Sequence, residues 1–223
     1  MILQAVLVAC FASVALGSIC CSPDKWEGYQ FTYGEFAQKR GSLLAGKPAF
    51  KTGSIQVSYD AADQKVAKYG NYTNNGQIVK FKSINDYKAG RGYYILPAQR
   101  ICSSFQLGGQ FQPACVPDNA VDQGPFAFGV GDNRLDMQGY QVNSRKNGDD
   151  VTTVVTVTQD GCIPVVENMW GTRRGRTFFS NVGFNDLTVG IKDSSVFQPP
   201  DYCEEGPVES LDFLHAGYSI MRQ

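Results

Sequence analysis

The stretch VTTVVTVT, residues 151–158, decides the fold class of this chain. All of its residues are β-branched, and such side chains favour strands because they restrict rotation about χ1 and crowd a helical turn. A second stretch, GYQFTYGEF at residues 28–36, alternates aromatic with polar residues and places Tyr29, Phe31 and Tyr33 on one side of a strand. Both patterns predict a protein built from β-strands.

Two hairpins are predicted farther along the chain. The segments SIQVSY and KVAKY flank the turn residues 60–63, so residues 54–69 are expected to form the first hairpin. A turn at residues 89–90 joins 78–87 to 92–96 in the second. Short strands separated by glycine-rich turns are typical of a sandwich or a half-barrel.

The other segments complete an all-β plan with one short helix. Strands are expected at residues 126–130, 176–184 and 187–191, whereas residues 97–125 are rich in Gly, Gln and Pro and predict an irregular or edge-like segment. A C-terminal helix is predicted over residues 208–220, because apolar residues recur there near helical spacing after a Gly-Pro pair. The predicted fold class is therefore all-β with a short C-terminal helix.

The N-terminus predicts secretion. Residues 1–17 are mostly apolar, and Ala15 and Gly17 have the spacing that signal peptidase accepts, so this segment is predicted to be a cleaved signal peptide. Residues 18–223 contain no linker-like stretch and suit a single β-rich domain. An extracellular location follows for the mature chain.

Six cysteines follow the signal peptide, an even number that predicts up to three disulfides in an oxidising compartment. They are Cys20, Cys21, Cys102, Cys115, Cys162 and Cys203. The sequence alone leaves many pairings open. A zinc cluster is the alternative, but zinc ligands usually come in closely spaced pairs, and the only histidine is His215.

The composition argues against two other classes of protein. Twenty basic and 21 acidic residues give a net charge of −1, whereas nucleic-acid binders carry a basic face. A hydrolase with a Ser or Cys nucleophile would have to use His215, and the chain has no Gly-x-Ser-x-Gly motif. We therefore expect a protein that is not an enzyme, although two carboxylates on separate strands could still form a glycosidase-type pair.

Local motifs predict two kinds of surface site. Asn71 begins the sequon Asn-Tyr-Thr in the polar stretch GNYTNNG, which predicts an N-glycan on an exposed loop. Acidic clusters at residues 118–119, at Asp122, at 132–133 and at 149–150 offer the hard oxygen ligands that calcium prefers. Solvated turns also favour Asp and Asn, so calcium is a candidate cofactor without assigned ligands.

Aromatic residues are plentiful, with 14 Phe, 11 Tyr and two Trp in the chain. In a β-sheet protein of this size such residues can fill a packed core or line a cavity for a ligand. Composition does not separate these two arrangements, and both stay open at this point.

Four motifs resemble those of the ependymin family. They are CSPDKWEG at residues 21–28, VSYDAADQKV at 57–66, GCIPV at 161–165 and VGIKDSSVFQPPDYC at 189–203. The last is the most specific, because it is similar to the family's C-terminal signature almost throughout. The motifs follow the family's order, so the chain resembles an ependymin-related protein over nearly all of its mature length.

The resemblance implies a fold and two disulfides. The implied fold has two stacked antiparallel sheets that form a half-barrel or sandwich around a hydrophobic pocket, as in bacterial lipoprotein carriers, and often assembles as a homodimer. The implied disulfides are Cys21–Cys162 and Cys102–Cys203. The two cysteines that then remain, Cys20 and Cys115, are expected to pair with each other.

The resemblance also implies a function. It leads us to expect a secreted glycoprotein that binds a lipid, an acyl chain or another hydrophobic small molecule. The candidate lining residues are the aromatic side chains Tyr29, Phe31, Tyr33 and Tyr93. Because family members are associated with calcium, extracellular matrix and cell adhesion, the alternative is a calcium-dependent matrix or cell-adhesion protein whose pocket is incidental.

Overall fold

The computed structural model describes residues 18–35, 38–39, 51–74, 76–173 and 175–203, and most of these residues lie in strands. The strands are β1 (Ser18–Cys21), β2 (Lys25–Glu35), β3 (Gln38–Lys39), β4 (Lys51–Asp60), β5 (Lys65–Asn74), β6 (Gln77–Asp86), β7 (Arg91–Leu96), β8 (Ile101–Gln106), β9 (Cys115–Pro117), β10 (Val121–Val130), β11 (Asn133–Lys146), β12 (Asp149–Thr158), β13 (Pro164–Arg173) and β14 (Arg176–Val189). Two short 3-10 helices, η1 (Pro97–Gln99) and η2 (Ser194–Phe197), accompany them. The predicted signal peptide and the predicted helix at 208–220 lie outside the described residues.

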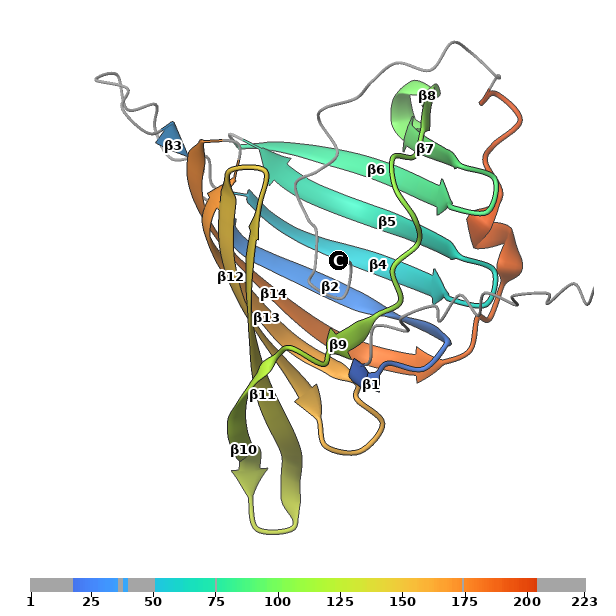
Figure 1. The fold of residues 1–223 in the computed structure, drawn as a ribbon. Helices are drawn as coiled ribbons and strands as arrows, with labels where there is room; N and C mark the ends of the chain where they lie inside the picture. Colours follow the sequence, from blue (N-terminus) through green and yellow to red (C-terminus); the bar gives the residue numbers. More distant parts are fainter. Residues whose placement is uncertain (1–17, 36–37, 40–50, 75, 174, 204–223) are drawn as a thin grey trace, which may run out of the picture.

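The strands form two antiparallel sheets of very different size. Twelve strands make one sheet in the order β10-β11-β12-β13-β14-β2-β4-β5-β6-β7-β8, with β3 beside β14, and β1 pairs with β9 in the other. The large sheet curves strongly and remains open, because β10 and β8 are its two ends (Figure 1). The prediction of an all-β fold with two antiparallel sheets is therefore confirmed.

The two faces of the large sheet can be distinguished from the packing. Val57 and Val66 lie in one buried cluster with Val142 and Val155, although three strands separate β4 from β12 in the sheet. Such distant strands share a cluster only on the side toward which the sheet curves. We call this side the inner face and the opposite side the outer face.

Both predicted hairpins are present, and the first extends beyond its predicted ends. β4 and β5 pair from Lys51↔Asn74 to Asp60↔Lys65, and the backbone N–H of Asp63 donates to Asp60 Oδ1 at 2.9 Å within the turn. β6 and β7 pair around the turn that contains Gly90. The first hairpin is extended because its alternation of inner and outer side chains continues on both strands away from the turn.

Two segments differ from their predicted form. The predicted strands at 176–184 and 187–191 are one strand, β14, whose pairing with β2 shifts register between Asn185 and Thr188. A bulge absorbs the extra residues without ending the strand. Within residues 97–125, β8 and β9 are regular strands, and only part of this segment is irregular.

Candidate functional site

One end of the inner face is closed by the small sheet. Trp26 stacks on Tyr59 with ring centroids 5.5 Å apart, and Tyr59 stacks on Phe111 from the segment before β9 at 5.8 Å. The backbone N–H of Ala114 donates to the Tyr59 hydroxyl at 2.8 Å, and Val116 is fully buried in the same cluster. Residues 111–116 therefore lie across the inner face and cover its apolar side chains at this end.

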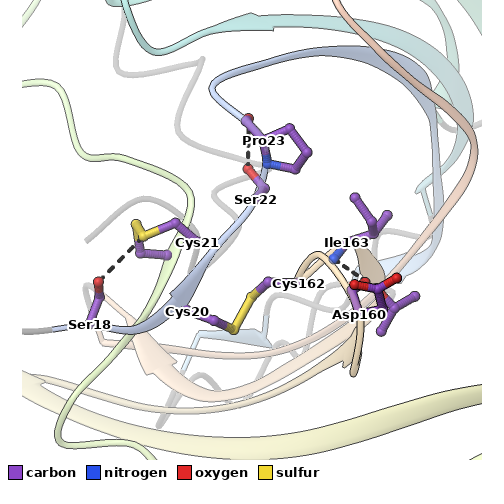
Figure 2. Close-up of a disulfide and its surroundings, with 10 residues drawn as sticks. Ser18, Cys20, Cys21, Ser22, Pro23, Asp160, Cys162 and Ile163 are labelled. Carbon is purple, nitrogen blue, oxygen red and sulfur yellow. Dashed lines mark hydrogen bonds between the residues drawn. A yellow bond between two sulfur atoms is a disulfide. The ribbon is translucent and has the colours of Figure 1, made fainter.

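One disulfide links the two strands of this small sheet and another attaches the sheet to the segment before β13, and their pairing corrects the pairing that the family resemblance implies. Cys20 is joined to Cys162 and Cys21 to Cys115. Consecutive residues of a strand point to opposite sides, as Figure 2 shows for Cys20 and Cys21. The register of β1 with β9 places Cys21 opposite Cys115, with Cα atoms 3.9 Å apart, so only Cys20 faces Cys162.

The third disulfide joins Cys102 to Cys203, as the resemblance implies. It connects β8 to the segment that follows β14, across 101 residues of sequence. Bridges that close loops of this length typically contribute about 2 to 4 kcal/mol to stability, because they restrict the unfolded chain.

Away from the small sheet, the inner face carries an aromatic cluster. The Phe81 ring lies 5.6 Å from the Tyr72 ring and 5.9 Å from the Tyr94 ring, measured between centroids. The hydroxyls of Tyr72 and Tyr94 are hydrogen-bonded at 3.3 Å. Burial raises the pKa of Tyr94 well above its ordinary value, and the hydrogen bond with Tyr72 adds to this effect. The cluster therefore presents apolar rings and two hydroxyls that are hydrogen-bonded to each other.

Polar side chains lie beside these rings on the same face. Lys68 Nζ donates to Gln30 Oε1 at 3.3 Å, and Gln30 is buried. Glu167 is fully buried, and the strand register places it with Val155 and Val182, which are also fully buried or nearly so. An apolar face with a few buried polar groups is the usual composition of a site for a small hydrophobic molecule.

Four glycines lie on the inner face, either at the aromatic cluster or next to it. A Cβ at Gly70 would collide with the carbonyl oxygen of Ser54, and one at Gly53 would lie 2.7 Å from the carbonyl oxygen of Asn71. A Cβ at Gly92 would collide with the Phe105 ring. The inner face also has Gly28. Because glycine lets a neighbouring backbone or ring come close, these positions support the strong curvature of the sheet.

The predicted lining residues Tyr29 and Phe31 lie on the outer face. Tyr29 is 42% exposed and Phe31 49% exposed, and each pairs with an outer-face residue of β4. The inner positions of β2 are instead Trp26, Gly28 and Gln30. The physical reason is packing, since the inner surface at Gly28 is filled by Leu187, whose Cγ would lie 2.9 Å from a Cβ there.

The other two predicted lining residues are not on the described inner face either. Tyr93 packs on the outer face against the cluster that contains Ile84 and Phe197. The backbone of Tyr33 pairs with Thr52 and Asn181, and its side chain lies outside the described part of the structure. Away from the small sheet, the aromatic cluster of the inner face is therefore formed by Tyr72, Phe81 and Tyr94, none of which was predicted as a lining residue.

The segment after β14 covers one end of the outer face. Phe197 of η2 is buried against Ala67, Ile84 and Ile95. Lys82 Nζ donates to the carbonyl oxygen of Gln198 at 3.1 Å, and burial lowers the pKa of this lysine.

The same segment is bound near the start of β2. Glu27 is buried, and its carboxylate accepts hydrogen bonds from Ser58 Oγ at 2.9 Å and from the backbone N–H of Lys192 at 3.2 Å. Together with the Cys102–Cys203 bridge, these contacts hold residues 190–203 on the outer face. The specific C-terminal motif is thus a structural clamp.

Asn71 lies within β5, where the sequence predicted a loop. Its side chain is exposed on the outer face, in register with Ser54 of β4 and Lys80 of β6. The hairpin turn falls after Asn74, at the end of the polar stretch, because β5 and β6 pair as far as Asn74↔Gln77. The sequon is accessible although it is in a strand.

Two of the acidic clusters, at Asp122 and at residues 149–150, are engaged in the described structure. Asp122 Oδ1 accepts a hydrogen bond from the backbone N–H of Gly124 at 2.7 Å, and Asp150 pairs with Arg145 at 3.2 Å. Among the residues that the structure describes, no group of three or more His, Cys, Asp or Glu side chains could hold a metal ion. Within that same part of the chain, no helix is long and apolar enough to cross a membrane. His215 lies outside the described residues.

Comparison with known proteins identifies the family. The sequence profile named Ependymin matches residues 75–203. Ependymin-related protein 1 of Haliotis asinina is 34% identical over 91% of this chain and 99% of its own length, and Ependymin-related protein 2 of the same organism is 30% identical over the same shares. Mammalian ependymin-related protein 1 of Rattus norvegicus is 26% identical over 86% of this chain and 79% of its own length. The chain therefore belongs to the ependymin family.

Proposed function

We propose that this protein is a secreted, non-catalytic glycoprotein that binds a hydrophobic ligand, a lipid or an acyl chain, on the inner face of its large sheet. The observation that carries the proposal is the aromatic cluster of Tyr72, Phe81 and Tyr94, which forms on the concave side next to Lys68 and Gln30. The rings offer contact to an apolar chain, and the amine and amide offer hydrogen bonds to its polar end.

Secretion and glycosylation are supported by separate features. Three disulfides are typical of proteins that fold in an oxidising compartment, whereas proteins of the reducing cytosol rarely contain disulfides. The exposed sequon at Asn71 would then meet the glycosylation machinery of the secretory pathway, so we propose that Asn71 carries an N-glycan.

The homodimer is a further part of the proposal. β10 is an edge strand of the large sheet, and its side chains Phe126, Phe128 and Val130 are exposed. Exposed apolar side chains on an unpaired edge favour association. Replacement of Phe128 by Glu is expected to shift the sedimentation of the secreted protein from dimer to monomer, and an unchanged species would exclude this contact.

Native mass spectrometry of protein secreted from eukaryotic cells tests the ligand proposal. A lipid that remains bound at about one per chain, and that organic extraction recovers, would support it. Tyr72→Ala, which leaves the sequon intact, is expected to reduce lipid occupancy because the ring lies on the inner face. Tyr69→Ala is the matched control, because Tyr69 lies on the outer face of the same strand.

Two outcomes would contradict the proposal. Equal lipid loss in both tyrosine variants would show that lipid binding does not depend on the inner face. An empty protein whose self-association or collagen binding depends on calcium would instead support the matrix and cell-adhesion role.

A further inference from the structure

The outer face is half covered by protein and half open. Residues 190–203 cover the end that contains Ala67 and Ile84. The open part carries several exposed aromatic side chains, among them Tyr29, Phe31 and Tyr69, of which Tyr69 is 53% exposed. A cluster of exposed rings on one sheet face is unusual for a secreted chain and calls for a covering partner.

The strand register places the glycosylation site inside this open aromatic patch. Phe31, Ser54 and Asn71 are neighbours across β2, β4 and β5, and one step along these strands Tyr29, Gln56 and Tyr69 are neighbours in the same way. All six side chains are on the outer face, because the residues between them contribute to the inner face.

The distances suit a sugar attached to Asn71. Tyr69 is two residues away on the same side of the strand, which corresponds to about 7 Å. Phe31 is two strands away, which corresponds to about 10 Å. The side chain between Asn71 and Phe31 is Ser54, which is small and leaves the space above it open to a ring.

The chemistry of the patch matches an N-acetylglucosamine ring. One side of this sugar presents C–H groups, and the face of an aromatic ring carries the negative charge that attracts them. Gln56 lies between Tyr29 and Tyr69, and Lys80 lies beside Asn71 on β6, so both polar side chains can hydrogen-bond the hydroxyl and acetamide groups. The covalent bond to Asn71 keeps the sugar close, so its local concentration is high without a separate binding event.

We propose that the N-glycan on Asn71 folds back onto the outer face and packs its first sugar against Tyr69 and Phe31. The glycan thereby covers the open aromatic patch and stabilises the fold, in the way that residues 190–203 cover the other end. The inference rests on the glycosylation of Asn71 proposed above, and it is independent of the ligand on the inner face.

The test is a set of thermal denaturation measurements on protein secreted from eukaryotic cells. Wild-type protein, protein trimmed by an endoglycosidase to a single N-acetylglucosamine, and the Asn71→Gln variant are compared. The full glycan and the single sugar are both expected to raise Tm by about 2 to 4 °C, which is the size of shift that one modest interaction gives in a chain of this length. Mass spectrometry measures the occupancy of Asn71 in each sample.

The same comparison is then made in Tyr69→Ser and Phe31→Ser backgrounds. The gain in Tm from the sugar is expected to fall to less than half in each, whereas Tyr69→Phe keeps the ring and keeps the gain. Phe179→Ser is the matched control, because Phe179 is 40% exposed on the same face in β14 but lies far from Asn71 along the strands. The gain should be unchanged in that variant.

The outcomes separate the two proposals. An Asn71 without glycan in the wild-type protein would overturn both the glycosylation and this packing. A glycan that is present, but gives the same Tm gain with and without the Tyr69 ring, would overturn the packing alone. Loss of the gain in Phe179→Ser as well would indicate a general effect of surface rings and would also overturn it.

Discussion

The two faces of the large sheet are built from the same strands but are covered in different ways. The inner face buries Val57, Val155 and Val182 by curvature and by the small sheet that lies across it. The outer face has no such enclosure, and a disulfide-anchored segment covers one end of it through Phe197. The difference teaches that curvature together with a covering segment encloses the inner face, whereas the outer face is enclosed only where a covering segment packs on it.

The largest expected effect comes from removing the central ring of the inner cluster. Phe81→Ala should lower the free energy of unfolding by about 3 to 5 kcal/mol, because Phe81 is buried between Tyr72 and Tyr94 and leaves a cavity. Phe179→Ala on the outer face should change it by less than about 0.5 kcal/mol. Urea denaturation followed by fluorescence measures both, and similar losses would contradict the distinction between the faces.

The next effect concerns the clamp on the outer face. The double variant Cys102→Ser and Cys203→Ser should lose about 2 to 5 kcal/mol, since the bridge closes a long loop. Residues 190–203 should then become sensitive to limited proteolysis, which mass spectrometry of the fragments detects. A clamp that stays protected after loss of the bridge would mean that contacts such as Glu27 with Lys192 hold it without the disulfide.

Two glycine substitutions compare a position where a neighbouring strand comes close with a position where the space is open. Gly70→Ala should cost about 1 to 3 kcal/mol, because its Cβ would collide with the backbone of β4 at Ser54. Gly183→Ala should be nearly neutral, because a Cβ there would meet nothing within 4 Å. The difference between their denaturation midpoints checks this expectation, and an equal cost would show that the close approach at Gly70 is not required.

The smallest expected effect is a dependence on alkaline pH. Tyr94 has a raised pKa in the folded protein, so it keeps its proton above about pH 10, where an unfolded tyrosine loses it. The folded state then binds more protons than the unfolded state, and stability should fall as pH rises above this value. Tyr94→Phe should weaken that fall. NMR of tyrosine labelled at Cζ should show Tyr94 titrating at higher pH in the folded protein than in the unfolded protein, and titration at the same pH in both states would contradict the prediction.

Much of the fold could be predicted from local patterns, whereas the side of the sheet on which each strand face would lie could not. The hairpin at 54–69 followed from alternation and turn residues, which act between neighbours in sequence. The same alternation in β2 suggested Tyr29 and Phe31 as lining residues, but alternation is symmetric and defines two faces without saying which is inside. The decisive signal was weaker, namely the glycines at inner positions such as Gly28.

The inner aromatic positions could have been found only in part. Tyr93 and Tyr94 are adjacent, so one ring of the pair had to lie on each face, and nothing in the sequence distinguishes the inner ring from the outer one. Tyr72 was obscured by its place in the sequon, which suggested a loop. A continuous strand through Asn71 would have placed Tyr72 and Asn71 on opposite faces from the start.

The sequence by itself determined that this protein is all-β, that six cysteines are available for bridges, and that the chain resembles the ependymin family, because composition, strand patterns and motifs are local properties. Only the tertiary structure decided that Cys20 meets Cys162 and Cys21 meets Cys115, since that choice depends on the register between strands far apart in sequence. It also decided which face is interior, because the direction in which a sheet curves depends on packing over many strands at once.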